Sequence, residues 1–237
     1  RNTILKIITE ETFKTKPNYR MKITNEDNMQ LMARYEDNHF DLAIVDPPYG
    51  GNDAFESKMT DSKKQASKRT KYKEFKNIPP TKEYFNELKR VSKNTIIWGG
   101  NYFGSIGGGL VWNKNGTAFG EGEIAICTTH KSVRIFEYTW NGMIQQNMKN
   151  KEIRIHPTQK PIALYEWILM NYAKEGDKIL DTHLGSGSIA IASHNLGYDL
   201  TACELDKEYY EASIKRINEH KSQLTMFTNT KINKDEN

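Results

Sequence analysis

The chain has 237 residues, a formal net charge of +4 and a hydrophobic fraction of 37%, which fits about one globular domain. No apolar run approaches the ~18 residues that a membrane-spanning helix needs, and the N-terminus lacks the pattern of a signal peptide. Cys127 and Cys203 stand alone and the six histidines are scattered, so we expect neither a disulfide framework nor a metal site, and a cytoplasmic location.

Strand-like and helix-like segments alternate along the chain. The expected strands are Met21–Thr24, Phe40–Val45, Asn94–Trp98, Leu110–Trp112, Glu123–Thr128, Ser132–Tyr138, Lys178–Leu180 and Asp199–Cys203. The expected helices are Met29–Arg34, Thr81–Val91, Pro161–Tyr172, Ser188–Leu196 and Lys207–Lys221, with Thr81 as the N-cap of the second. This alternation predicts an α/β fold in which a mostly parallel, twisted sheet carries helices on both faces.

The domain organisation follows from composition. We expect one domain over residues 1–225, with a strand- and turn-rich part at 99–155 and a basic, mobile insertion at 51–80. The polar residues 226–237 are expected to form a disordered tail.

The insertion carries a concentrated positive charge. Ser57–Lys76 contains eight basic and two acidic residues, a net +6 in twenty residues. Two interpretations stay open, a solvated surface loop and a segment that contacts nucleic acid phosphates. The candidate contacts are Lys63, Lys64, Lys68, Arg69, Lys71 and Lys73.

The first segment that could carry chemistry is Asp46-Pro47-Pro48-Tyr49-Gly50, directly after the expected strand FDLAIV. Ligands of open α/β sheets bind outside the carboxyl ends of strands. The two prolines supply no backbone N–H, so a carboxylate, carbonyls and an aromatic ring form an acceptor-rich pocket. Such a pocket suits a flat molecule with an amino group; the alternative is a turn that closes the strand.

The second segment is DTHLGSGS, residues 181–188, between an expected strand and an expected helix. Gly185 and Gly187 allow the backbone to approach a ligand closely. Glu204 lies about twenty residues further on, at the end of the next strand, where ribose hydroxyls are bound in dinucleotide sites. The third glycine of the dinucleotide fingerprint and the lysine of a P-loop are both absent, so a nucleoside without phosphates fits better.

Together with HPTQKP, residues 156–161, and CELDKEYYEASIKRI from Cys203, these motifs resemble those of S-adenosylmethionine-dependent DNA amino-methyltransferases. The order, with the catalytic motif first, is the permuted beta type, and the resemblance spans about residues 21–220. The segments NTIIWGGNYF, GLVWNKN and RIHPTQKP resemble those of small phage or prophage adenine methylases. Aspartate at the head of DPPY, here Asp46, rather than serine, is the family's usual adenine signature. The resemblance implies a Rossmann-like methyltransferase fold with circularly permuted motif order. The chain departs from the family at Thr182-His183, where Pro-Phe is frequent, and we expect no large separate recognition domain.

The resemblance also implies roles for individual residues. The catalytic residues would be Asp46, Pro47, Pro48 and Tyr49. The cofactor-binding residues would be Asp27, Asp46, Thr158, Lys160, Pro161, Asp181, Leu184, Gly185, Ser186, Gly187, Ser188, Glu204 and Leu205. Glu204 would accept from the ribose hydroxyls, and Asp27 would touch the cofactor's adenine amine or serve as a helix N-cap. Trp98, Trp112 and Phe119 are assigned to the core more readily than to the site.

The implied reaction transfers a methyl group from S-adenosyl-L-methionine to the exocyclic amino group of a flipped-out adenine in double-stranded DNA. The alternatives are the cytosine amino group, adenine in RNA, an inactive nucleic-acid-binding partner and a nicotinamide-dependent enzyme. The protein would be encoded by a bacterium or phage. Its oligomeric state, with a homodimer among the options, and a restriction endonuclease partner stay open.

Overall fold

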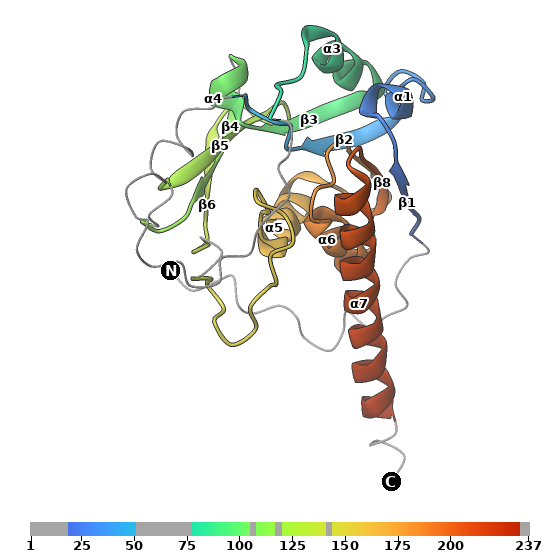
Figure 1. Cartoon of the computed structure of the whole chain (residues 1–237). Helices are drawn as coiled ribbons and strands as arrows, with labels where there is room; N and C mark the ends of the chain where they lie inside the picture. The colour runs from blue at the N-terminus through green and yellow to red at the C-terminus, as the bar shows by residue number, and fades with distance from the viewer. Residues whose placement is uncertain (1–18, 51–76, 105–107, 117–119, 141–143, 233–237) are drawn as a thin grey trace.

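Eight strands form a single sheet in the order β1-β8-β7-β2-β3-β5-β4-β6 (Figure 1). The strands are β1 (Met21–Asn25), β2 (Phe40–Val45), β3 (Ser92–Trp98), β4 (Gly108–Asn113), β5 (Gly122–Cys127), β6 (Val133–Glu137), β7 (Lys178–Asp181) and β8 (Asp199–Glu204). The neighbours from β1 to β3 are all parallel, β5 runs antiparallel to both β3 and β4, and β6 is parallel to β4. The mostly parallel α/β sheet expected from the sequence is therefore confirmed.

The computed structural model describes residues 19–50, 77–104, 108–116, 120–140 and 144–232. The segment Ser57–Lys76, and with it every basic residue named as a candidate nucleic-acid contact, lies outside the described residues, as does Phe119. None of the helices in the described part of the chain is long and apolar enough to cross a membrane.

Helices cover both faces of the parallel part of the sheet. They are α1 (Asn28–Met32), α3 (Lys82–Val91), α4 (Gly100–Phe103), α5 (Ile162–Tyr172), α6 (Ser188–Leu196) and α7 (Lys207–Ile232). Figure 1 shows α1 and α3 on one side of the sheet and α5 and α6 on the other. Both faces of the central strands are therefore buried, as is usual for parallel sheets.

The alternation of side chains along the central strands divides the core into two layers. In β2, Leu42 and Ile44 pack with the α5–α6 side, whereas Ala43 and Val45 pack with α1 and α3. All four are at most 1% exposed. Successive side chains of a strand point to opposite faces, so the continuous apolar run at residues 42–45 supplies both layers.

β7 and β2 are neighbours in the sheet, but the connections that follow them lead to opposite sides of it. β7 leads through α6 to β8 on one side, and β2 leads to β3 on the other. Parallel pairing of β2 with β7 sets Asp46 and Asp181 at the same edge of the sheet, at the carboxyl ends of the two strands. Ligands of open α/β sheets bind at such a switch point.

Thr81 is the N-cap residue of α3 as expected, although its side chain makes no capping hydrogen bond. Two other details of the sequence-based elements need correction. α7 continues to Ile232, so residues 226–232 of the expected tail are helical, because no glycine or proline interrupts the chain from Lys207 onward. The short helix α4 was not expected.

Candidate active site

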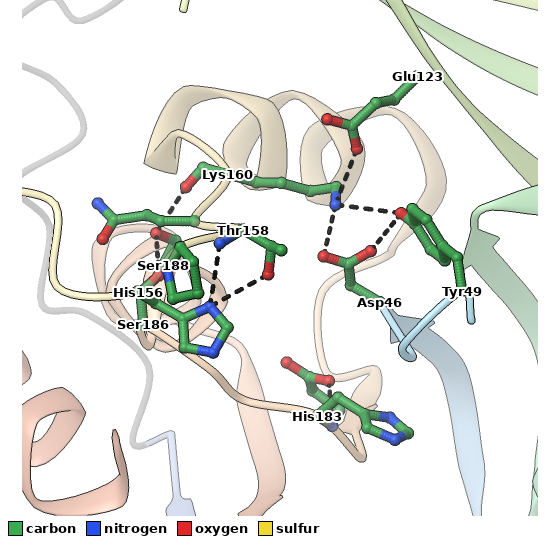
Figure 2. Close-up of polar contacts among 12 residues, drawn as sticks. Asp46, Tyr49, Glu123, His156, Thr158, Lys160, His183, Ser186 and Ser188 are labelled. Carbon is green, nitrogen blue, oxygen red and sulfur yellow. Dashed lines mark hydrogen bonds and ion pairs between the residues drawn. The ribbon is translucent and has the colours of Figure 1, made fainter. Parts of the chain in front are cut away.

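The carboxylate of Asp46 lies just beyond the end of β2, and each of its oxygens accepts a hydrogen bond from another side chain of the protein (Figure 2). Oδ1 accepts a hydrogen bond of 2.6 Å from the Tyr49 hydroxyl, and Oδ2 lies 2.5 Å from Nζ of Lys160. Burial raises the pKa of Asp46, and the nearby ammonium of Lys160 opposes that rise. A buried, lysine-paired carboxylate at a switch point is a strong candidate for a functional group.

Tyr49 is held against the backbone of the next strand. A Cβ at Gly99 would lie only 2.2 Å from the Tyr49 ring, and Gly99 has a φ of +75°, so only glycine fits there. The Tyr49 ring stacks on Tyr102 with centroids 4.9 Å apart and planes 13° apart. Tyr102, which the sequence did not single out, is therefore a second aromatic residue of the site.

A hollow of about 180 Å³ opens beside this aromatic pair. Its lining residues are Tyr49, Gly99, Asn101, Tyr102, Gly122, Glu123 and Ile124. Aromatic rings, an amide and a carboxylate therefore meet in one concave surface next to Asp46, which has the chemistry needed to hold a flat polar ring.

Lys160 was expected to face the cofactor, and the structure places its ammonium between two carboxylates. Besides Asp46, Nζ lies 3.0 Å from Oε2 of Glu123 on β5, and the lysine side chain is 3% exposed. Burial alone would lower the pKa of Lys160, but the two carboxylates raise it above its ordinary value. Glu123 was missed by the sequence analysis because an isolated acid in the strand GEIAIC carries no local signal.

The loop between β7 and α6 requires glycine at position 187 for steric reasons. Gly187 is the N-cap residue of α6 and has a φ of +75°, and a Cβ at this position would lie 3.0 Å from Cδ1 of Ile217. Asp181 is 2% exposed and accepts a 2.9 Å hydrogen bond from the backbone N–H of His183. Burial raises the pKa of Asp181 to about 8 and lowers the pKa of His183 to about 4.

Glu204, at the end of the neighbouring strand β8, is hydrogen-bonded to the backbone of this loop. Its Oε2 accepts from the backbone N–H of Gly185 at 2.8 Å, and its Oε1 accepts from that of Asp206 at 3.0 Å. Each carboxylate oxygen has two lone pairs, so both can also accept from a ligand hydroxyl. Leu205, the adjacent candidate, is 71% exposed, and Leu184 is buried with its N–H bonded to the carbonyl of Cys203.

Asp27 is the N-cap of α1, one of the two roles considered for it. Its Oδ1 accepts from the backbone N–H groups of Met29 and Gln30 at 2.9 and 3.2 Å. Both capping bonds fall on Oδ1, so the cap leaves Oδ2 available for a ligand.

The HPTQKP segment is tied to the start of α6. The hydroxyl of Ser188 donates to the carbonyl of Lys160 at 2.8 Å, and Arg216 donates to the carbonyl of Ser186. Pro161 is the buried N-cap residue of α5. Thr158 is exposed, and its hydroxyl lies 3.1 Å from Nδ1 of His156 (Figure 2). The hydroxyl of Ser188 thus joins this segment to the glycine loop.

Trp98 and Trp112 belong to the core, at 0% and 1% exposure. Nζ of Lys160 lies 5.4 Å from the centroid of the Trp98 ring. Within the described ranges, no three His, Cys, Asp or Glu side chains gather in a way that could hold a metal ion.

We expect Asp181→Asn to raise the thermal stability of the ligand-free protein. Because the folded-state pKa is about 8, the unfolded chain releases this proton first, and wild-type stability falls as pH rises from about 4 to 8. The amide removes that loss, so the melting temperature at pH 8 should rise by several degrees, at about 2–4 °C per kcal/mol. Scanning calorimetry at pH 5 and pH 8 measures it.

The gain should shrink toward pH 4, where Asp181 is protonated in the folded state and increasingly so in the unfolded chain. Glu175→Gln, at an exposed position, is the control. A variant that is less stable than the wild type at pH 8 would contradict the buried-acid interpretation of Asp181.

Comparison with known proteins gives three kinds of match. Residues 112–215 match a family model described as DNA methylase. The type II methyltransferase M2.DpnII of Streptococcus pneumoniae is 37% identical over 78 residues, 33% of this chain and 29% of that protein. M.HpaI of Haemophilus parainfluenzae is 38% identical over 68 residues, 29% of this chain and 22% of that protein. The matched segments thus span less than a third of these relatives' length.

Solved structures share the fold at low sequence identity. The M1.HpyAVI–SAM complex has a TM-score of 0.52 and 19% identity, over 83% of this chain and 99% of that one. The PvuII DNA methyltransferase, named as cytosine-N4-specific, has a TM-score of 0.54 and 12% identity over 88% and 94%. The Rossmann-like methyltransferase fold expected from the motifs is therefore confirmed.

Proposed function

We propose that this relative of the S-adenosylmethionine-dependent DNA methyltransferases transfers a methyl group from S-adenosyl-L-methionine to the exocyclic amino group of adenine in DNA. The main support is the juxtaposition at the switch point, where the carboxylate of Asp46 and the glycine loop after β7 lie at the same edge of the sheet. An acceptor for an amino group and a loop for a nucleoside thus share one site.

The residues present fit the cofactor. A side chain at Gly187 would meet Ile217, and the carboxylate of Glu204 stands beside the loop with capacity for two hydroxyls. Asp27 would bind the adenine amine through Oδ2, and Asp181, Gly185 and Gly187 would enclose the methionine and ribose. When bound, the cofactor supplies a methyl group on a sulfonium.

The residues around Asp46 would activate the target amine. An aromatic amino nitrogen is a poor nucleophile because its lone pair is delocalised into the ring. If the Asp46 carboxylate and the Pro47 carbonyl each accept one N–H, the lone pair becomes localised, and the carboxylate stabilises the positive charge that develops on nitrogen. Alignment of this nitrogen with the sulfonium methyl provides a further part of the rate enhancement.

The target base must leave the DNA helix to reach this site. The hollow beside Tyr49 and Tyr102 would receive it, and Tyr102 offers an exposed ring at 59%. Base–aromatic stacking is worth about 1–3 kcal/mol, enough to compensate part of the lost stacking in the duplex.

The choice of adenine rests on aspartate, rather than serine, at position 46 in a DPPY motif. The second candidate is the amino group of cytosine, since a cytosine-N4-specific enzyme has the same fold. Adenine in RNA and an inactive binding partner are the remaining alternatives; the match to DNA methylases gives no support to nicotinamide chemistry.

One experiment separates these candidates. The protein is incubated with labelled S-adenosylmethionine and unmethylated genomic DNA or total RNA, and the products are digested to nucleosides for mass spectrometry. We expect labelled N6-methyl-2′-deoxyadenosine from the DNA sample and no labelled nucleoside from the RNA sample. N4-methylcytosine, or label in RNA only, would reject the proposal, and no label at all would favour the inactive partner.

The basic residues of Ser57–Lys76 should contact DNA phosphates. We expect simultaneous replacement of Lys63, Lys64, Lys68 and Arg69 by alanine to weaken binding about equally for all duplexes, because phosphate contacts carry no sequence information. The slope of log affinity against log salt should become shallower by up to about 0.9 for each phosphate that the variant no longer neutralises. Fluorescence anisotropy across a salt series measures it.

The control for loss of surface positive charge is Lys207→Ala with Lys215→Ala, at exposed positions on α7, which removes two charges where the test variant removes four. If the salt slope of the quadruple variant equals that of the wild type, the segment is a solvated loop. A loss confined to one DNA sequence would mean instead that it reads bases.

A further inference from the structure

A chain of four alternating charges connects Asp46 to Glu123 on β5 and to Lys114, directly after β4. Nζ of Lys160 lies 2.5 Å from Oδ2 of Asp46 and 3.0 Å from Oε2 of Glu123, and Nζ of Lys114 lies 2.5 Å from Oε1 of Glu123. The side-chain exposures run from 3% for Lys160 to 24% for Glu123. Two carboxylates and two ammonium groups give the cluster a formal charge of zero.

In this arrangement both oxygens of Asp46 already accept a hydrogen bond. Tyr49 donates to Oδ1 and Lys160 donates to Oδ2, so an amino group that donates to Asp46 must share an oxygen with one of these donors or displace it. Tyr49 is restrained by its close approach to Gly99 and its stack on Tyr102. Lys160 is the donor with a second acceptor within reach, because the same nitrogen already contacts Glu123.

The surroundings allow the Lys160 ammonium to shift without moving its backbone. The Lys160 carbonyl is fixed by the hydroxyl of Ser188 at 2.8 Å. Glu123 lines the hollow of about 180 Å³ next to Tyr49, so this carboxylate stands on the side from which a base would enter. Lys114 and Lys160 together lower the pKa of Glu123 to about 2 against the effect of burial, so Glu123 is ionised and able to receive an ammonium.

We propose that Lys160 is a positioning residue, which keeps the Asp46 carboxylate ionised in the free protein and moves onto Glu123 when the target amino group donates to Asp46. Glu123 is the second acceptor that permits this exchange. The inference rests on the proposed function, in that the displacing group is the target amine. No covalent bond or proton moves in the exchange: Lys160 stays an ammonium, and one hydrogen bond to Asp46 replaces another.

Loss of Lys160 should change the titration of Asp46. The ionisable groups that act on this carboxylate come from several elements: Lys160 and Glu123, Tyr49 on its own loop, Asp181 on β7 and Tyr165 on α5. Lys160 is the cation among them that directly contacts Asp46. Without it, burial and the remaining negative charges raise the pKa of Asp46 further.

The test compares Lys160→Met, Glu123→Gln and a matched control, Lys93→Met. Lys93 forms an exposed pair with Asp41 at 2.7 Å, between β3 and β2 but away from the site. The carboxyl carbons of ¹³C-labelled aspartate are followed by NMR against pH in the free protein, with Asp46→Asn to assign the signal. Methyl transfer to unmethylated genomic DNA is measured in parallel as kcat against pH.

In Lys160→Met we expect the Asp46 signal to titrate at least one pH unit higher and the acid limb of kcat to shift with it. Glu123→Gln, which keeps the shape of the side chain, should lower kcat tenfold or more with unchanged affinity for S-adenosylmethionine. Lys93→Met should leave the Asp46 titration, kcat and its pH dependence, and the affinity for S-adenosylmethionine unchanged. A purely structural role would lower the melting temperature of the variants without moving the Asp46 titration.

An unshifted Asp46 titration in Lys160→Met, or a wild-type kcat in Glu123→Gln, overturns the inference. Should Lys160→Met fail to fold, the Glu123→Gln result decides. If the wild type transfers no methyl group, the proposed function fails, and the NMR titration still decides separately whether Lys160 holds Asp46 ionised.

Discussion

Asp46→Ala should reduce kcat for methyl transfer by at least about 10³-fold, the upper range for loss of one preorganised electrostatic partner. The variant removes the charged acceptor for the target amine and leaves Lys160 paired only with Glu123. Affinity for S-adenosylmethionine should stay within a few fold, because Asp46 is expected to act chiefly on the target amine, whereas the loop after β7 and Glu204 on β8 are expected to hold the ribose and methionine of the cofactor. Single-turnover transfer and calorimetric titration measure the two quantities.

Asp46→Asn refines this prediction. The amide keeps one oxygen acceptor but loses the negative charge, and it turns an NH₂ group toward a neighbouring donor, either Lys160 or Tyr49. We therefore expect severe impairment here too. Glu36→Ala, at an exposed position, is the control for a lost surface carboxylate, and near wild-type turnover in Asp46→Ala would refute the acceptor-pair mechanism.

Glu204→Ala should weaken binding of S-adenosylmethionine by roughly 10- to 150-fold. Hydrogen bonds to a charged acceptor are worth about 1.5–3 kcal/mol, and each 1.4 kcal/mol is about tenfold in affinity. The variant also frees the backbone N–H groups of Gly185 and Asp206, which the carboxylate now holds at 2.8 and 3.0 Å. Isothermal titration calorimetry measures the dissociation constant.

Glu204→Gln separates the contribution of the negative charge from that of the hydrogen bonds to the loop backbone. It retains one oxygen to hold the Gly185 or Asp206 N–H, so an intermediate loss is expected if charge toward the ribose matters. Glu211→Ala, an exposed carboxylate on α7 with 63% of its side chain accessible, should bind the cofactor as the wild type does. Unchanged affinity in Glu204→Ala would remove this residue from the cofactor site.

The sequence by itself determined the order of the elements and the position of both motifs at strand ends. α6 begins at Ser188 and ends at Leu196 as expected, and β2 spans Phe40–Val45 as expected. These features carry local signals: a continuous apolar run marks a strand buried on both faces, and glycines mark the turn into the next helix. The family resemblance added roles that no single motif would carry.

Only the tertiary structure decided which side chains meet. Lys160 contacts Asp46 across 114 residues of sequence, and Glu123 joins them because β5 is inserted antiparallel between β3 and β4. The stack of Tyr49 on Tyr102 likewise depends on the pairing of β2 with β3. Such contacts leave no periodic or local trace in the chain, because strand order is set by packing of the whole sheet rather than by the residues of one segment.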